Sequence, residues 1–386
     1  MMRTVSLSDI CTKITSGGTP LTKRDNYYGG GIPWLRTQEV NFGNIYSTEK
    51  TITELGLKNS SAKIIPKDSV IVAMYGATAG KSAINKIPLA TNQACCNLII
   101  DNSKADYRFV YYYLVNSYEK LLSAAVGAAQ QNLGSKQISA MTINLPLLDQ
   151  QKKIANILGS LDEKIELNRR MNETLEQLGQ ALFRYYFVDN PEAKNWKRGV
   201  ISDLGEVVTG KTPSKKNQKF FGDEVAFLKV PDMHKTSIVI KTSDNLSLMG
   251  AESQKSKYIS RWSTCVSCIA TVGVVSLAGK NMQTNQQINS IIPRESYFKF
   301  FNYFLMRHKS DYIKTLASSG SATPNLNMGH FSNITVVIPD RELLKEFDAR
   351  VNHLFLQMEN NLQENETLMN IRDSLLPKLI SGEIIL

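Results

Sequence analysis

The sequence predicts an α+β protein with two similar mixed α/β domains, each followed by a long helix, and the two helices are expected to pair as an antiparallel coiled coil. Three observations predict this fold class. The chain repeats itself once, each copy begins with short β-like runs, and each copy ends in a long segment with a seven-residue apolar repeat. The length of 386 residues also suits two or three domains better than one.

The internal repeat extends from one end of the chain to the other. Gly17 to Pro20 (GGTP) returns as Gly210 to Pro213 (GKTP), a shift of 213 − 20 = 193 residues, and twice 193 is the whole chain of 386. The same shift relates three further pairs of segments: Tyr27-Tyr28-Gly29 and Phe220-Phe221-Gly222, Thr91-Asn92-Gln93 and Thr284-Asn285-Gln286, and Asn172 to Leu175 and Asn365 to Leu368. Two copies and nothing else are therefore expected.

The first part of each copy is predicted to be globular, over residues 1–146 and 194–339. Short apolar runs such as DSVIVAMYG and CNLIID in the first copy, and VAFLKV and SCIATVGVV in the second, are typical of strands. One helix is expected near residues 107–125 and its counterpart near 297–316. Their aromatic residues are expected in the core, with base stacking as the alternative. These residues are Tyr111, Tyr112, Tyr113, Phe300, Phe301, Tyr303 and Phe304.

The second part of each copy, residues 147–193 and 340–386, is predicted to be mainly one long helix. Asn168 and Asn361 occupy the same place in the two heptad patterns, where a polar residue fixes register at some cost in stability; the alternative is a tolerated surface asparagine. Pro377 should stop or kink the second helix. The apolar heptad positions are Ile154, Leu161, Leu175 and Leu182, then Phe347, Leu354, Leu368 and Leu375, and further residues expected to fill the first seam are Ile157, Leu158, Ile165, Met171 and Leu178.

Composition restricts the class of partner. A formal net charge of +10, with a pI near 9.2, favours nucleic acid or an acidic membrane face, and a merely basic protein is the alternative. No stretch approaches ~18 uninterrupted apolar residues, so no membrane span is expected. No signal peptide is expected either, and five cysteines, an odd number, then indicate reduced thiols in the cytoplasm.

Motifs of metal binding and catalysis find little support. Cys265 and Cys268 have CxxC spacing but lack the second pair that a structural zinc site needs, so we expect them in the core, within a buried strand TCVSCIATVGVV. No nucleophile elbow, HExxH motif or Rossmann fingerprint is present. We therefore expect no enzyme activity and no bound metal. The four histidines, which form no spaced ligand set, are His234, His308, His330 and His353.

The stretch AMYGATAGKSAI, residues 73–84, is similar to a phosphate-binding loop but fails two tests. A P-loop has four residues between its glycines, whereas only three separate Gly76 from Gly80. The second copy keeps the threonine and the glycine, as Thr271 and Gly273, but loses the lysine and serine that follow. A turn glycine between two strands is the better interpretation.

Two similar domains on paired helices can contact two places on duplex DNA, because helices of about 40 residues span roughly 60 Å. The two domains differ in sequence, so the target would be split and asymmetric. Lysine-rich loops can bind phosphates, and Arg, Lys, Asn, Gln and Thr side chains can read bases. Positions that are shared by both copies, such as Asn92 and Asn285, are structural in an alternative interpretation. The candidates for DNA binding are Lys23, Arg24, Arg36, Gln38, Thr78, Lys81, Asn92, Gln93, Gln131 and Asn132 in the first copy, and Lys211, Lys215, Lys216, Lys219, Lys229, Thr271, Asn285, Gln286, Gln287 and Asn325 in the second.

Over essentially its whole length the chain resembles a specificity (S) subunit of a type I restriction-modification system. The segments that carry the resemblance are TSGGTPLTKRDNYYGGGIPWLRTQEV, MYGATAGKSAI with ATNQACCNLI, QNLGSKQISAMTINLPLLDQQKKIANIL, ALFRYYFVDNP and RDSLLPKLISGEI. The second copy departs from the pattern, since ATVGVVSLAGKNMQTNQQ lacks the lysine after its glycine and SATPNLNMGHFSNITVVIPD is looser.

The resemblance implies two target recognition domains that each read one half of a bipartite DNA target. It implies that the paired helices set the gap and dock two methyltransferase (M) subunits, which bind S-adenosylmethionine, and that restriction (R) subunits, which use ATP and Mg²⁺, complete the complex. This chain itself would bind no cofactor and perform no chemistry. A stand-alone DNA-binding protein, an NTP-using enzyme built on residues 76–82 and a purely structural helical scaffold are the alternatives.

Overall fold

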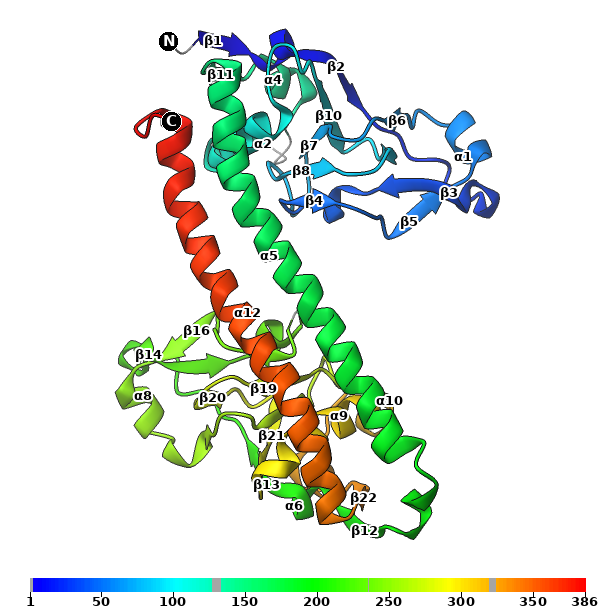
Figure 1. Ribbon diagram of the computed structural model, residues 1–386, viewed down its shortest axis with the longest axis vertical. Helices are drawn as coiled ribbons and strands as arrows, with labels where there is room; N and C mark the ends of the chain where they lie inside the picture. The colour runs from blue at the N-terminus through cyan, green and yellow to red at the C-terminus, as the bar shows by residue number, and fades with distance from the viewer. Residues whose placement is uncertain (1–2, 127–132, 235, 319–323) are drawn as a thin grey trace. The chain divides into compact units, whose positions relative to one another are not determined.

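The computed structural model describes residues 3–126, 133–234, 236–318 and 324–386. The chain forms two compact units, Met1–Ile165 with Thr367–Leu386, and Glu166–Glu366. The division falls inside both long helices, so each unit holds one α/β domain and a stretch of each helix (Figure 1). The expected domain boundaries at residues 146, 193 and 339 separate each α/β domain from its long helix, whereas the two compact units divide the helices themselves. These boundaries therefore stay a prediction.

The first unit contains two mixed sheets and a strand pair. The five-stranded sheet has the order β2-β10-β7-β8-β4, the four-stranded sheet has the order β5-β3-β9-β6, and β1 pairs with β11. Strand β7 is a run of four apolar residues that is buried from end to end, as a central strand covered on both faces requires. The elements are β1 Arg3–Ser6, β2 Cys11–Ser16, β3 Tyr28–Leu35, β4 Asn44–Ile45, β5 Lys50–Ile52, α1 Glu54–Lys58, β6 Ile64–Ile65, β7 Val70–Ala73, β8 Ser82–Asn85, β9 Leu89–Thr91, β10 Cys95–Ile100, α2 Tyr107–Asn116, α3 Tyr118–Val126, α4 Ser135–Ala140 and β11 Thr142–Leu145.

The second unit has the same topology. Its sheets have the orders β13-β21-β18-β19-β15 and β16-β14-β20-β17, and β12 pairs with β22, so every strand has a counterpart in the first unit and the predicted repeat is confirmed. The elements are β12 Lys197–Val200, α6 Ile201–Leu204, β13 Gly205–Thr209, β14 Phe221–Leu228, α7 Val230–Met233, β15 Ile238–Val239, β16 Asp244–Leu246, α8 Leu248–Glu252, β17 Tyr258–Ile259, β18 Thr264–Ser267, β19 Val275–Ala278, β20 Met282–Thr284, β21 Ile288–Pro293, α9 Lys299–His308, α10 Ser310–Ser318, α11 Met328–Ser332 and β22 Thr335–Ile338.

Three expected elements are divided in the structure. The helix expected near 107–125 is α2 followed by α3, and its counterpart is α9 followed by α10, because the backbone leaves helical geometry at Ser117 (φ −96°, ψ 9°) and at Lys309 (φ −89°, ψ 3°). The segment TCVSCIATVGVV is two strands instead of one, since β18 ends at Ser267 and a turn with positive φ at Ala270 and Gly273 leads into β19.

The predicted core roles of the aromatic and cysteine side chains are confirmed. Of the seven aromatic residues named above, six are buried and Tyr113 is partly buried. Cys265 and Cys268 are both buried, and this burial raises the pKa of each thiol to about 12. Such thiols stay protonated and packed.

The long helices are α5 (Leu148–Phe183), which continues as a π-helical turn over Arg184–Val188, and α12 (Arg341–Ser381). Of the stop or kink expected at Pro377, the stop is wrong, because α12 continues for four more residues, and the kink stays a prediction. Pro377 lies on an exposed face, where water can bond the carbonyl that loses its helical partner.

Within the second unit α5 and α12 run antiparallel, as two amide hydrogen bonds show. Asn168 Nδ2 donates to Asn365 Oδ1 at 2.9 Å, and Asn361 Nδ2 donates to Asn172 Oδ1 at 2.8 Å. The repeat shift of 193 turns 168 into 361 and 172 into 365, so the two bonds are equivalent. Asn168 and Asn361 are buried, not surface residues, and their role in fixing register stays a prediction.

The expected placement of Met171 and Leu178 in the seam is wrong. Both side chains are exposed, at 37% and 47%. The seam uses Asn172, four residues after Asn168, because residues four apart on a helix share a face. In the first unit the two helices meet through an ion pair, with Arg372 Nη1 at 2.9 Å from Asp162 Oδ1.

Candidate nucleic-acid interface

The same loop is held in the same way in both units. In the first unit the Gly-x-Thr-Pro loop lies against the Thr-Asn-Gln turn, with Gly18 N donating to Thr91 O at 2.9 Å. In the second, Lys211 N donates to Thr284 O, also at 2.9 Å. A Cβ atom at Gly17 or Gly210 would collide with the backbone of the turn. Close approach of two backbones therefore explains why both motifs recur in the sequence.

Exposed cations lie within or just after each of these loops. All six lysine and arginine candidates in the two loops are exposed, and within the described residues none forms an ion pair. They are Lys23 and Arg24 in the first unit and Lys211, Lys215, Lys216 and Lys219 in the second. Cations without a protein partner can neutralise phosphates at little desolvation cost.

Two other candidate cations are engaged within the protein. Arg36, just after β3, forms an ion pair with Glu49 and lies 3.5 Å from Glu39. Lys229, just after β14, forms an ion pair with Asp244. Both are about three-quarters buried, so each is partly shielded from solvent and has its charge balanced by a carboxylate. Gln38, beside Arg36, is exposed.

Several amide and hydroxyl candidates hold turns together. Asn92 Oδ1 accepts a hydrogen bond from Thr37 Oγ1 at 2.9 Å, and Thr78 Oγ1 donates to Thr37 O at 2.8 Å. In the second unit Asn285 Nδ2 donates to Gln287 Oε1 at 2.9 Å. These contacts support a structural role at these positions, the alternative considered for Asn92 and Asn285.

The remaining candidates differ in their surroundings. Lys81 Nζ donates to Asn41 Oδ1 at 2.6 Å and lies 5.7 Å from the centre of the Phe42 ring. Thr271 and Asn325 are exposed, and Gln93 and Gln286 are exposed beside the loops. Gln131 and Asn132 lie outside the described residues.

The structure agrees with the rejection of a phosphate-binding loop at residues 73–84. A P-loop leads into a helix, whereas Lys81 leads directly into strand β8. Gly76 and Gly80 both have positive φ, of 86° and 80°, and Gly273 has φ 89°. These residues form the turn between β7 and β8, and between β18 and β19, as expected.

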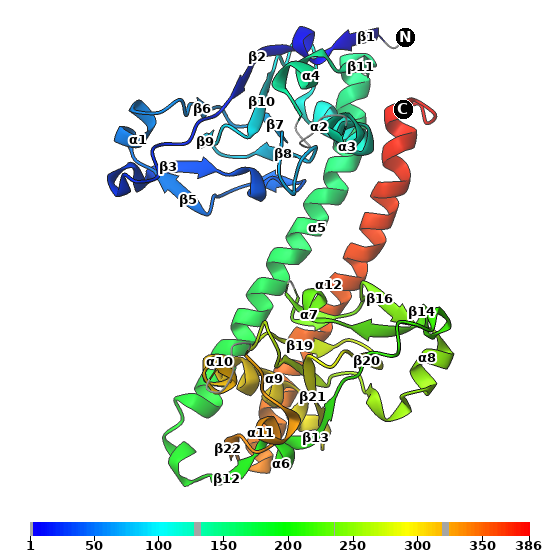
Figure 2. The same cartoon turned by 180° about the vertical axis from the view of Figure 1, so that it is seen from behind.

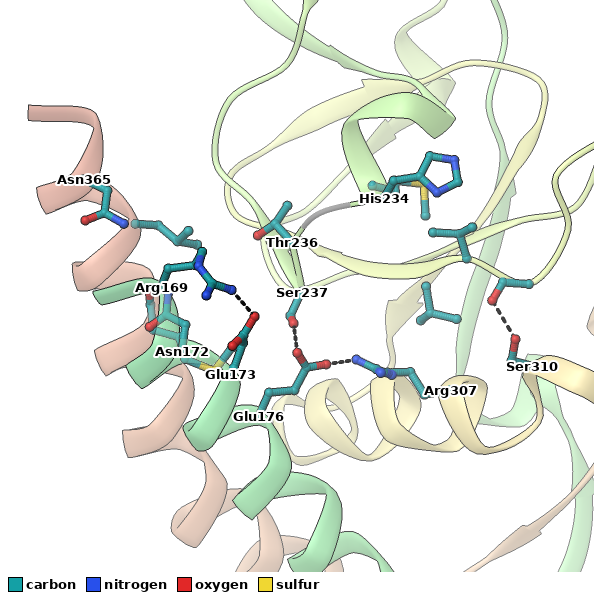
Figure 3. Close-up of a pocket in the computed structure, with 16 residues that line it drawn as sticks. Arg169, Asn172, Glu173, Glu176, His234, Thr236, Ser237, Arg307, Ser310 and Asn365 are labelled. Carbon is teal, nitrogen blue, oxygen red and sulfur yellow. Dashed lines mark hydrogen bonds and ion pairs between the residues drawn. The ribbon is translucent and has the colours of Figure 1, made fainter. Parts of the chain in front are cut away.

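A polar pocket of about 740 Å³ lies in the second unit, between α5, the segment after α7 and the junction of α9 with α10 (Figure 3). Its principal group is Glu176 of α5, which accepts hydrogen bonds from Tyr303 OH at 2.6 Å and from Ser237 Oγ, and forms an ion pair with Arg307. The view from behind shows α9 beside α5 (Figure 2). The carboxylate thus fastens the α/β domain to the helix.

No sequence pattern singled out Glu176. Its repeat counterpart, 176 + 193 = 369, is Met369. The only signal in the sequence was therefore a charged residue in one copy where the other copy has an apolar residue. Among the described residues no group of three or more His, Cys, Asp and Glu side chains could hold a metal ion. Within those same residues, no helix combines the length and the apolar character that crossing a membrane requires.

The duplicated α/β fold, with one cationic loop on each copy, defines a protein with two related domains. A family model described as "Type I restriction modification DNA specificity domain" matches residues 2–177 and 193–355, one match for each copy. The chain belongs to this family.

Relatives agree with this assignment. The chain is 35% identical over 353 residues to the HindI type I restriction enzyme specificity subunit of Haemophilus influenzae, covering 72% of this chain and 77% of that protein. It is 28% identical over 398 residues to the MjaIX specificity subunit of Methanocaldococcus jannaschii, covering 96% and 91%. The crystal structure of a type I restriction-modification S subunit from M. genitalium has the same fold, with a TM-score of 0.63, 15% identity, and coverage of 98% and 96%.

Proposed function

We propose that this chain is the DNA-reading subunit of a type I restriction-modification complex and that its two α/β domains read the two parts of a split, asymmetric target in double-stranded DNA. Duplication with divergence is the observation that carries the proposal. Every strand recurs in the same order, yet the loops differ: the loop of the second unit has four lysines between residues 210 and 220, where the first has Lys23 and Arg24 beside Asp25. One scaffold with two surfaces suits two different half-sites.

The charges of the candidate residues predict two roles within each domain, phosphate binding and base reading. The unpaired lysines and arginines would bind phosphates and provide affinity that depends on salt. Gln38 and the divergent pair Arg36 and Lys229 are the better candidates for base reading, because they differ between the copies or lack a structural bond. A base that either cation contacts would have to compete with its carboxylate partner, which favours a base with good hydrogen-bond geometry.

Docking of partner subunits is supported by an apolar stripe on α5 that the seam does not use. Leu167, Met171, Leu178 and Tyr185 are four, seven and seven residues apart, and their exposed fractions lie between 37% and 73%. Such spacing on one helix face suits packing against another helix. We propose two methyltransferase subunits and the restriction subunits as partners. S-adenosylmethionine, ATP and Mg²⁺ would then be bound by the partners, and this chain would perform no catalysis.

A methylation map tests the proposal. The chain is co-expressed with its cognate methyltransferase subunit in a host without DNA methylation, and methylated adenine is located by long-read sequencing. We expect a split, asymmetric motif with one gap length, which disappears when this chain is omitted. Both proteins expressed without new methylation would contradict the proposal and favour the alternative of a stand-alone DNA-binding protein, which a direct binding selection would then examine.

A further inference from the structure

A threonine–glutamine pair is present at equivalent places in the two units. Thr19 Oγ1 donates a hydrogen bond to Gln93 Oε1, and Thr212 Oγ1 donates to Gln286 Oε1 at 2.6 Å. The residue numbers differ by 193 at both positions. Each threonine is partly buried in the Gly-x-Thr-Pro loop, and each glutamine is exposed on the Thr-Asn-Gln turn.

The bond fixes the orientation of each glutamine amide. A glutamine side chain has one acceptor oxygen and one NH₂ group with two donor hydrogens. With the oxygen bonded to threonine, the NH₂ group is the part left to interact, and within the described residues neither Nε2 atom has a hydrogen-bond partner. Each pair therefore presents an oriented donor on an exposed surface.

Three carbonyl groups of the two loops already accept hydrogen bonds. Trp34 Nε1 donates to Gly18 O at 3.0 Å, and Tyr28 OH donates to Pro20 O at 2.6 Å. In the second unit Gln254 Nε2 donates to Lys211 O at 2.8 Å. These three oxygens, which would repel an anion, are thus bonded within the protein, while the exposed cations of the same loops can attract one.

The repetition itself indicates what the donors bind. Two domains that read different half-sites cannot use an identical residue in an identical setting to tell the half-sites apart. A feature common to all DNA sequences can be bound by the same donor in both, and the backbone phosphate is such a feature. Neutral amide donors beside lysine and arginine side chains are usual phosphate contacts.

We propose that Gln93 and Gln286 donate hydrogen bonds to backbone phosphates of the target DNA, and that Thr19 and Thr212 are positioning residues that aim them. The inference rests on the proposed function as a DNA-reading chain. It assigns one sequence-independent phosphate contact to each half of the target. The competing explanation is that the Thr–Gln hydrogen bond only holds the loop in place. That role requires the glutamine oxygen but not its NH₂ group.

Replacement of the amide by a carboxylate separates the two explanations. Gln93→Glu with Gln286→Glu keeps an oxygen that can accept from threonine, so the loop remains fastened, but it removes the donors and places a negative charge beside the phosphate. Gln177→Glu, on an exposed part of α5, is the control for added charge. The full chain in complex with its methyltransferase subunit is titrated, by fluorescence anisotropy, with one duplex that contains the mapped target and one that lacks it.

We expect Gln93→Glu/Gln286→Glu to raise the Kd by about tenfold or more, and by the same factor for both duplexes, because charge-assisted hydrogen bonds are lost. The methylated motif should stay the same. Thr19→Val/Thr212→Val should weaken both affinities by a smaller factor, and Thr19→Ser/Thr212→Ser should restore them. Thermal melting of each variant checks that the chain still folds.

Two results would overturn the inference. Affinities equal to those of Gln177→Glu would leave the pairs as loop fasteners, and a loss confined to the target duplex, or a changed base in the motif, would make the glutamines base readers. In both cases the wild-type methylation motif would still be present. Its absence would refute the proposed function instead, so the two failures can be distinguished.

Discussion

The two units fasten the same α/β fold to the long helices through a tyrosine and a carboxylate, but the arginine that pairs with the carboxylate lies on a different helix. In the first unit Tyr112 OH of α2 donates to Asp162 Oδ2 of α5 at 2.7 Å, and Arg372 of α12 pairs with Asp162. In the second, Tyr303 OH of α9 donates to Glu176 of α5 at 2.6 Å, and Arg307, also of α9, pairs with Glu176. The Thr–Gln pairs, by contrast, are the same in both.

The two arrangements show which features of the attachment the fold does not dictate. Attachment of a domain to a helix needs enough burial and satisfied polar groups, so an arginine from α12 or an arginine from α9 can balance the partly buried carboxylate. Contacts that recur unchanged, such as the loop–turn pairs, respond to a requirement that both domains share. Substitutions at matched positions in the two units test this distinction.

The largest effect is expected at Glu176. Glu176→Ala leaves the fully buried Tyr303 hydroxyl and the Arg307 guanidinium without their carboxylate, at a cost of about 2–3 kcal/mol after allowance for the partial exposure of Arg307. Hydrogen exchange of the α9 amides in the second unit should accelerate by about thirtyfold or more. The α2 amides of the first unit should be unchanged.

Met369→Ala, at the repeat counterpart of Glu176, provides the matched control. It removes part of an apolar side chain and should cost about 1 kcal/mol, with faster exchange confined to the first unit. Unchanged exchange in α9 of Glu176→Ala would show that the domain is held by its apolar core alone.

The next effect concerns the cationic loops. Removing three lysines by Lys215→Ala, Lys216→Ala and Lys219→Ala should lower affinity for all DNA sequences by about 2 kcal/mol at physiological salt, because each lost phosphate contact releases one counterion fewer. The slope of log K against log salt should fall by about 0.9 for each contact, so by more than in Lys23→Ala/Arg24→Ala. Titrations at several salt concentrations measure both slopes, and equal slopes in wild type and variants would contradict the phosphate assignment.

These predictions also show what the sequence could and could not provide. The repeat, the helices and the strands were predictable because periodicity and duplication are properties of the chain itself. The break at Ser117 and the passage of α12 through Pro377 were not, because they depend on local backbone angles and on which face is exposed. Glu176 was missed because a bond between residues 176 and 303 leaves no local pattern, and the ion pairs of Arg36 with Glu49 and of Lys229 with Asp244 were missed for the same reason.

A smaller effect is expected at a buried asparagine on α9. Helix α9 begins 299 − 107 = 192 residues after α2, so Asn302 corresponds to Val110, and both are fully buried. Within the described residues neither polar side-chain atom of Asn302 has a hydrogen-bond partner. Asn302→Val should therefore stabilise the second unit by about 1–2 kcal/mol, since an unsatisfied buried amide is replaced by the apolar residue found at the equivalent place in the first unit.

Val110→Asn is the reciprocal change and should destabilise the first unit by at least as much. Urea unfolding measures both free energies, with α2 and α9 followed separately by pulsed hydrogen exchange. Destabilisation by Asn302→Val would mean that the amide has a partner, such as an ordered water, that stabilises the fold.

The smallest effect is expected in the turn between the paired strands. Gly76, three residues after the end of β7, has φ 86° and open space around the position of a Cβ atom, while Ala270, three residues after the end of β18, has φ 61°. A residue with a side chain is destabilised by about 1–2 kcal/mol at positive φ. Glycine avoids this strain, but the greater conformational entropy of its unfolded state offsets part of the gain. Ala270→Gly should thus stabilise the second unit by about 0.5 kcal/mol, and Gly76→Ala should destabilise the first by about the same amount. Neither change alters a packed contact, so opposite shifts of the urea midpoints in the two variants would measure the free-energy cost of the backbone conformation alone. Shifts of the same sign would show that the two turns do not share one conformation in solution.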